Sequence, residues 1–348
     1  MKLATEISQL QYSFEVPEAK LKLVDRLGYD LVFASENAGS DIFTPLAYSL
    51  AITERLGVGT SLAVTSARSP ACTASTFLTL KHLARDRLVV AGIGNSGIGR
   101  IEGWHGMPWA KGSARLVDYT EILRKMFDGD YPLRHEGDYA SVPYRGADAQ
   151  YQGPTLGGLL EPREGIPILW GTGGRERIIL TAQHADGWLT LGFGLGMMQT
   201  YQPLLEEGFA RAARPKSLKD FEIWSHIDVI VSNDVKGAMQ PFKEWTVRMV
   251  GGRGGNIGGG RRSVYADQMV WSGFSEAADR VMDLVDAGRR EEAAAAVPDE
   301  YIDGRFLIGP IDRIEERARM WRDAGPTGLI IRSEYLDVFQ PIKRAIDG

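Results

Sequence analysis

Short apolar, largely β-branched runs alternate with longer amphipathic stretches along most of the chain. Continuous apolar runs are typical of parallel strands that are buried on both faces. These runs predict eight strands, at residues 2–7, 31–35, 56–64, 88–93, 166–170, 188–191, 221–231 and 329–331.

Between the predicted strands, apolar residues recur at helical spacing. Residues 17–27 place Pro17 near the first turn and Gly28 just after the last turn, as helix ends prefer. Residues 310–324 carry a similar apolar stripe. Further helices are predicted at residues 43–55, 70–84, 114–127, 175–185 and 197–213.

Two segments interrupt this alternation. Residues 130–165 are rich in glycine, proline and tyrosine and predict irregular structure. Residues 233–308 form a second irregular segment, with a Gly/Arg tract at 251–262 and a helical run at 276–296 that we expect on the surface. We expect both segments to be insertions.

Eight strands with helical connections predict an α/β protein, a closed parallel (β/α)₈ barrel with insertions after the fourth and seventh strands. An open doubly wound sheet gives a similar alternation and is the alternative. The sequential order, with no division into halves, favours the barrel. We expect residues 1–348 to form a single domain.

Composition narrows the possible partners and locations. The net charge of −5, with acids and bases interspersed, disfavours nucleic acid and anionic membranes as partners. The single cysteine, Cys72, excludes an internal disulfide. Neither a signal peptide nor an apolar run of ~18 residues is present, so we expect a cytoplasmic protein. The five histidines lack metal-ligand spacing, so we expect no metal.

In a barrel of this kind, functional residues follow the C-terminal ends of the strands. The clearest candidate is the glycine cluster after the fifth strand, because N–H groups at the start of a helix bind anions. The turn consists of Gly171, Thr172, Gly173, Gly174 and Arg175. It would suit a phosphate-bearing cofactor, but an ordinary turn that uses glycine for its backbone angles would look the same.

A second glycine-rich stretch, GIGNSGIG at residues 92–99, is similar to a dinucleotide-binding fingerprint. Such a match is weak by itself, and the fingerprint belongs after the first strand of a Rossmann unit. Here the stretch follows the fourth strand, which disfavours a nicotinamide dinucleotide.

Three segments carry a resemblance to a known family. They are TERLGVGTSLAVTSARSPACTASTFLTLKHLARDRLVVAGIGNSG within residues 34–97, PILWGTGGRERIILTAQHADGW at 167–188 and LIGPIDRIEERARMWRDAGPTGLII at 307–331. In this order they resemble the luciferase-like monooxygenase superfamily, whose fold is a bacterial-luciferase-like TIM barrel. They cover most of the chain outside the two irregular segments.

Within that superfamily, the chain is most similar to the branch that uses the deazaflavin coenzyme F420. That branch includes methylenetetrahydromethanopterin reductases and sugar-phosphate dehydrogenases. The resemblance implies a non-proline cis peptide at Ser61-Leu62 behind the cofactor ring and a phosphate at residues 171–175. The remaining cofactor-binding candidates are Thr65, Gly94, Asn95 and Ser96. Flavin mononucleotide (FMN) is the alternative cofactor, since its phosphate would use the same turn.

The chain also departs from its relatives. It has Glu36-Asn37 where related enzymes often carry Asp-His, so an imidazole that shuttles protons is absent there. Sugar-phosphate dehydrogenases place a glutamate at the position of Gly97 and a lysine within residues 191–194, and this chain lacks both. These differences argue against a sugar phosphate as substrate.

Three residues are catalytic candidates, each with a structural alternative. Glu36 could act as acid or base or pair with a nearby cation, and Asn37 could orient a substrate oxygen or be an exposed amide. His105, in a loop after the fourth strand, could reach the pocket or lie on the surface. We expect structural roles for His82 and His184, whereas the mid-strand His226 should be a core or interior-layer residue, with a catalytic role as the alternative. Arg253, Arg261 and Arg262 could form an anion-binding lid or a solvated loop.

Together these features predict an F420-dependent oxidoreductase that transfers a hydride between the deazaflavin C5 and a small organic substrate. An FMN-dependent monooxygenase and a non-catalytic flavin-binding relative are the alternatives. By resemblance we expect a homodimer.

Overall fold

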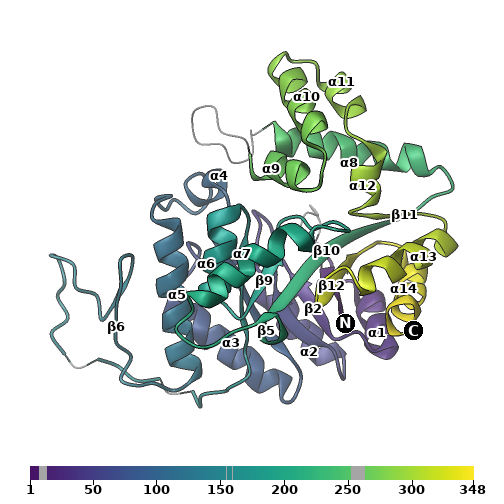
Figure 1. Ribbon diagram of the computed structural model, residues 1–348. Coiled ribbons are helices and arrows are strands. Elements are labelled where there is room, and N and C mark those ends of the chain that lie inside the picture. Colours follow the sequence, from purple (N-terminus) through teal and green to yellow (C-terminus); the bar gives the residue numbers. More distant parts are fainter. Residues whose placement is uncertain (8–13, 154, 159, 252–262) are drawn as a thin grey trace.

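The computed structural model describes residues 1–7, 14–153, 155–158, 160–251 and 263–348. Eight parallel strands close into a barrel (Figure 1). They are β1 (Lys2–Ile7), β2 (Leu31–Ala34), β3 (Gly57–Thr60), β5 (Val89–Gly94), β8 (Ile168–Thr172), β9 (Gly187–Thr190), β10 (Glu222–Val231) and β12 (Gly328–Arg332). Each of these strands pairs with the next one along the chain, and β1 also pairs with β12, so the ring of pairings is closed and the predicted barrel is confirmed.

Two short strands extend this sheet. Strand β4 (Ala63–Val64) pairs with the outer part of β5, and β11 (Leu307–Gly309) pairs with the outer part of β10. All eight predicted strands overlap an observed one.

Helices surround the barrel (Figure 1), and all but the short α4 and the C-terminal α14 lie where apolar stripes predicted a helix. They are α1 (Glu18–Leu27), α2 (Phe43–Ile52), α3 (Pro70–Ala84), the short α4 (Ile98–Ile101), α5 (Gly112–Phe127), α6 (Arg175–His184), α7 (Met198–Ala210), α13 (Ile311–Arg322) and α14 (Phe339–Asp347). Gly28 ends α1 with a φ of 76°, which is accessible to glycine without a steric cost. Ser69 caps α3 by accepting a hydrogen bond from the Cys72 amide.

Alternate residues of the strands point into the barrel. The interior is filled by eight buried side chains: Ala4, Leu31, Phe33, Val90, Leu169, Leu189, Trp224 and Ile330. Phe33 and Trp224 meet edge to face, with ring centroids 5.1 Å apart. The interior is therefore a packed core, and any ligand must bind above it.

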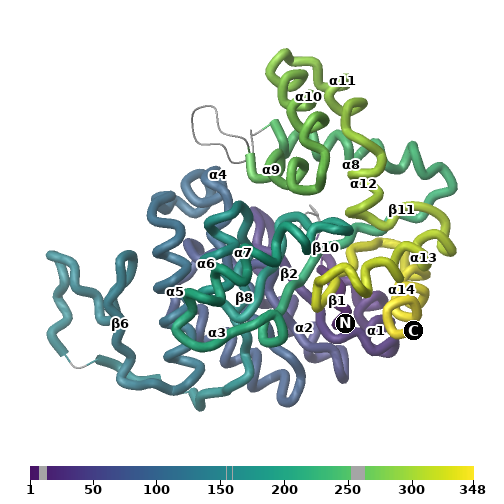
Figure 2. Tube along the Cα trace, in the orientation of Figure 1, coloured from purple at the N-terminus to yellow at the C-terminus, as the bar shows by residue number. Residues whose placement is uncertain are grey.

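The first insertion extends away from the barrel between α5 and β8 (Figure 2). Its only regular structure among the described residues is a hairpin of β6 (His135–Glu136) and β7 (Ser141–Val142). The prediction of a mostly irregular segment agrees with this description.

The second insertion corrects the prediction, because it is mostly helical. It contains α8 (Val235–Val250), α9 (Val264–Trp271), α10 (Ser275–Asp286), α11 (Arg290–Ala295) and α12 (Asp299–Asp303). The predicted run at 276–296 is two helices, separated around Gly288, whose φ is 77°. Val281 of α10 is fully buried in a core that the insertion builds for itself, so this run is no mere surface helix. Arg253, Arg261 and Arg262 lie outside the described residues.

Candidate active site

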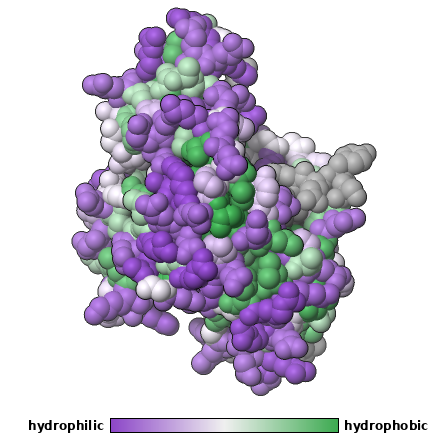
Figure 3. Space-filling model, turned by 90° about the vertical axis from the view of Figure 1, so that its right-hand side faces the viewer, coloured by the Kyte–Doolittle hydropathy of each residue, from purple (hydrophilic) through white to green (hydrophobic). Residues whose placement is uncertain are grey.

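A cavity of about 840 Å³ lies between the C-terminal ends of the strands and the helical insertion. Figure 3 shows apolar surface where the insertion, at the top, meets the barrel below it. The insertion lines the cavity with aromatic side chains, from Phe242, Trp245, Tyr265, Tyr301 and Phe306. In (β/α)₈ enzymes this end of the barrel holds the active site.

The barrel wall of the cavity follows from strand alternation. Moving two residues along a strand from a core residue reaches the next inward position. This step leads from the core to Glu6, Ser35, Gly171, Leu191, His226 and Arg332, and all six line the cavity. In the layer above the packed core, the side chains are thus large and polar at β1, β10 and β12, and small at β2 and β8.

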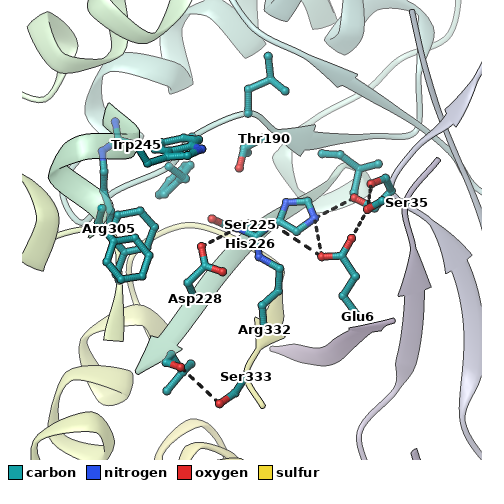
Figure 4. A pocket seen from close by; sticks show the side chains of 18 of the residues that line it. Glu6, Ser35, Thr190, Ser225, His226, Asp228, Trp245, Arg305, Arg332 and Ser333 are labelled. Atoms are coloured by element: carbon teal, nitrogen blue, oxygen red, sulfur yellow. Dashed lines mark hydrogen bonds and ion pairs between the residues drawn. The ribbon is translucent and has the colours of Figure 1, made fainter. Parts of the chain in front are cut away.

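The polar side chains of this layer form one network (Figure 4). Arg332 Nη2 lies 2.6 Å from Asp228 Oδ2, and Arg332 Nη1 lies 3.8 Å from Glu6 Oε2. The Ser35 hydroxyl contacts Glu6 Oε1 and lies 2.7 Å from the carbonyl oxygen of Ser61. Burial raises the pKa of the Glu6 carboxyl, although Arg332 and Ser35 oppose this rise.

His226 stands at the centre of this network. Its Nε2 lies 2.9 Å from Ser61 Oγ and 4.0 Å from Glu6 Oε2. Burial, together with the nearby Arg332 charge, lowers the pKa of His226 to about 3, so the imidazole is neutral at pH 7. We expected a core or interior-layer residue here, and the structure places His226 in the inward-facing layer that lines the cavity. The neighbouring Trp224 indicates this position. Trp224 points into the packed barrel interior, so His226, two residues further along β10, points to the same side and reaches the mouth of the barrel.

The predicted cis peptide is present between Ser61 and Leu62, and both residues line the cavity. A Cβ atom placed on Gly94 or Gly171 would lie 2.5 Å or 2.1 Å from Leu62 Cδ2. The two glycines therefore make room for the Leu62 side chain, which lies in the cavity wall.

The other candidates after β4 and β5 do not line the cavity. The Thr65 hydroxyl lies 2.9 Å from Asn95 Oδ1, and Asn95 Nδ2 donates to the Gly112 carbonyl at 2.6 Å. Ser96 adopts a φ of 59° next to them. These side chains connect one loop to the start of α5, which is a structural task.

Only one residue of the predicted phosphate-binding turn, residues 171–175, lines the cavity. Gly171 lines the cavity, whereas the Thr172 hydroxyl pairs with Thr181 at 2.7 Å. A Cβ atom on Gly173 would meet Leu191 at 2.8 Å and Val264 at 2.9 Å, so this part of the turn is covered. The two remaining residues are Gly174, which precedes α6 with a φ of 83°, and Arg175, which lies 3.3 Å from Glu207.

Of the catalytic candidates, only Asn37 lines the cavity. Glu36 is buried elsewhere, with Oε2 accepting a hydrogen bond from the Val64 amide at 2.7 Å and Oε1 paired with Arg68. This is the structural carboxylate that we considered as its alternative. His105 lies in the loop after α4, outside the cavity wall.

Several buried polar atoms at the cavity wall lack a hydrogen-bond partner among the described residues. They are Thr190 Oγ1, Ser225 Oγ and Arg305 Nε. The Arg305 guanidinium lies over the Tyr301 ring at 4.5 Å and forms no ion pair with a described carboxylate. Buried polar groups are normally satisfied, so these atoms are suited to form hydrogen bonds with a bound molecule, in which Arg305 Nε would be the donor.

The described ranges contain neither a cluster of metal ligands nor a helix of membrane-spanning character. No group of three or more histidine, cysteine or acidic residues there could hold a metal ion. Within these ranges, no helix is long and apolar enough to cross a membrane.

The chain is similar to enzymes of one family along nearly its whole length. It is 32% identical, over 95% of this chain and 94% of the relative, to a putative coenzyme F420-dependent oxidoreductase of Mycobacterium tuberculosis. It is 25% identical to the F420-dependent glucose-6-phosphate dehydrogenase of Segniliparus rotundus, over 91% of this chain and 89% of that enzyme.

Solved structures show the same fold. The coenzyme F420-dependent tetrahydromethanopterin reductase of Methanopyrus kandleri matches with a TM-score of 0.75 and 17% identity, over 99% of this chain and 98% of that one. An F420-dependent secondary alcohol dehydrogenase, in complex with an F420–acetone adduct, matches with a TM-score of 0.73 and 16% identity over the same shares. The luciferase-like monooxygenase family model matches residues 18–328. This chain is therefore an enzyme of the luciferase-like monooxygenase family.

Proposed function

We propose that this enzyme is an F420-dependent oxidoreductase that transfers a hydride between the deazaflavin C5 and a small organic substrate. The observation that carries the proposal is that Ser61, Leu62 and Gly171, which resemblance assigned to the cofactor, line the same cavity as the Glu6–His226–Arg332 network. The names of the relatives favour F420 over FMN as the cofactor.

The residues present suit the ring end of such a cofactor. Leu62 offers an apolar surface and Gly171 adds no bulk. The hydroxyls of Thr190 and Ser225, which have no hydrogen-bond partner among the described residues, belong to the same wall. A bound deazaflavin would supply the hydride acceptor. Leu191 and Val264 cover the turn at Gly173, so the proposal concerns the ring end and leaves the phosphate unplaced.

The substrate side of the cavity supports an apolar compound. The loop after β9 contributes Leu191, Gly192 and Phe193, without the lysine of the sugar-phosphate dehydrogenases. The insertion adds aromatic rings opposite the polar network. We therefore propose a substrate with an apolar skeleton and no sugar phosphate.

Anaerobic turnover tests this function. Purified enzyme is mixed with oxidised F420 and a panel of apolar secondary alcohols, and loss of the visible absorbance of F420 is followed. We expect loss without oxygen for at least one alcohol. Turnover that requires reduced FMN and oxygen would favour the monooxygenase alternative and contradict the proposal.

A further inference from the structure

We infer that the substrate binds through a hydroxyl oxygen at Nδ1 of His226, and that this imidazole exchanges the hydroxyl proton during oxidation to a carbonyl. The inference rests on the proposed function and deepens it. It assigns a substrate class, apolar alcohols and their ketones, and a catalytic residue on β10.

His226 is the histidine that lines the cavity. The other four histidines, His82, His105, His135 and His184, do not line the cavity. Asn37 lines it at the place where related enzymes carry an imidazole, but an amide does not exchange protons at neutral pH. The one imidazole of this cavity therefore comes from β10 and not from the loop after β2, where Asn37 lies.

The second support is the orientation of the ring. Nε2 is held by Ser61 Oγ at 2.9 Å and faces the Glu6 carboxyl at 4.0 Å, whereas Nδ1 has no partner among the described residues. Figure 4 shows the ring between the side chains of Glu6 and Thr190. A nearby carboxylate favours the tautomer with its proton on Nε2. That tautomer leaves the Nδ1 lone pair to accept a hydroxyl proton.

The third support is the set of charges that face the ring. Glu6 from β1 and Arg332 from β12 face it, and Asp228 from β10 pairs with Arg332. Lys20 of α1 lies behind Glu6, with Nζ 3.2 Å from the Glu6 carbonyl oxygen. In the free enzyme Arg332 opposes a positive imidazole. Glu6 is the carboxylate placed to stabilise the imidazolium that forms during turnover.

The carbinol C–H bond breaks, and its electron pair leaves as hydride to a two-electron acceptor of the deazaflavin class. The O–H bond breaks, its proton passes to Nδ1, and its electron pair forms the C=O π bond. The carbonyl product leaves, and the imidazolium then loses its proton to solvent. Reduction of a ketone uses the same atoms in reverse.

Nuclear magnetic resonance of the cofactor-free enzyme, labelled with ¹⁵N-histidine, tests the inference without turnover. At pH 6 we expect the His226 signal, identified by its loss in His226→Gln, to show a neutral ring with the proton on Nε2. Cyclohexanol should shift the Nδ1 resonance, whereas its methyl ether, which has no hydroxyl donor, should not. A proton on Nδ1, equal shifts with both compounds or no shift with either would overturn the inference.

Kinetics supply the second test. General acid–base groups contribute about 10²- to 10⁴-fold, so His226→Gln should lower kcat by at least about 100-fold. F420 affinity should stay within about twofold, and His105→Gln, outside the cavity, should leave kcat unchanged. Unaltered turnover by His226→Gln would contradict the inference. If the wild-type enzyme binds no F420, the proposed function fails, while the resonance experiment still decides the role of His226.

Discussion

Gly171 shows how one missing side chain shapes the cavity wall. A Cβ there would lie 2.1 Å from Leu62 Cδ2, so Gly171→Ala must displace Leu62. Overpacking of this kind costs about 1–3 kcal/mol of stability, and we expect F420 affinity to fall at least about tenfold. Chemical denaturation and fluorescence titration measure the two effects.

Two variants control this prediction. Gly99→Ala in α4 places its Cβ where no atom lies within 4 Å, and it should change neither quantity. Combining Gly171→Ala with Leu62→Ala should recover part of the lost stability, because the clashing atoms are gone. Equal losses in Gly171→Ala and Gly99→Ala would show that Leu62 is not the cause.

His226 also predicts how stability changes with pH. Its folded-state pKa of about 3 lies below the ordinary value of 6.5, so between these values the unfolded chain binds the additional proton. This group therefore makes the protein less stable as the pH falls from 6.5 towards 3. The raised pKa of Glu6 acts in the opposite direction, so the comparison must isolate His226.

The measurement is the melting temperature at pH 7 and pH 5 for the wild type and His226→Gln. We expect the wild type to lose more stability over this interval than the variant, which cannot take up that proton. A larger loss in the variant would contradict a neutral, buried imidazole.

At the scale of elements, the helical insertion forms a unit with its own core. Ile302 of α12 is fully buried there, and Ile302→Ala should cost about 2–5 kcal/mol. Hydrogen exchange should quicken mainly in α8 to α12 and leave the barrel strands protected. Leu83 is an exposed leucine on α3, and Leu83→Ala is the matched control. It should change neither the free energy of unfolding nor the rates of hydrogen exchange. Uniform loss of protection would show that insertion and barrel unfold together.

The sequence predicted the barrel better than the insertion for a physical reason. Strands such as β2 and β12 are buried on both faces, and their apolar runs reveal them without knowledge of their neighbours. Met239 and Val247 in α8 are buried in the separate core of the insertion, and polar residues between them dilute the apolar pattern. The Gly/Arg tract at 251–262 further obscured the helical spacing.

For the candidate site too, features set by a local motif were predicted, and features that depend on contacts between distant segments were not. The resemblance located the cis peptide at Ser61-Leu62, because a local motif specifies it. It did not reveal that Glu36 is paired with Arg68, a contact between separate loops. Glu6, Arg332 and His226 are distant in sequence and meet only because the barrel closes.

At the scale of the whole molecule, the cavity lies between two different surfaces. The barrel contributes polar side chains, and the insertion contributes aromatic side chains. Hydride transfer between a cofactor and an apolar alcohol needs this combination. The alcohol oxygen requires a proton acceptor, and its carbon skeleton requires a dry surface. The central claim is that a deazaflavin binds in this cavity.

Titration of the purified enzyme with F420 and, separately, with FMN tests that claim most directly. We predict saturable F420 binding, followed by fluorescence, that is at least about tenfold tighter than FMN binding. Gly171→Ala should weaken it and Gly99→Ala should not. Tight FMN binding with no measurable F420 binding would contradict the account.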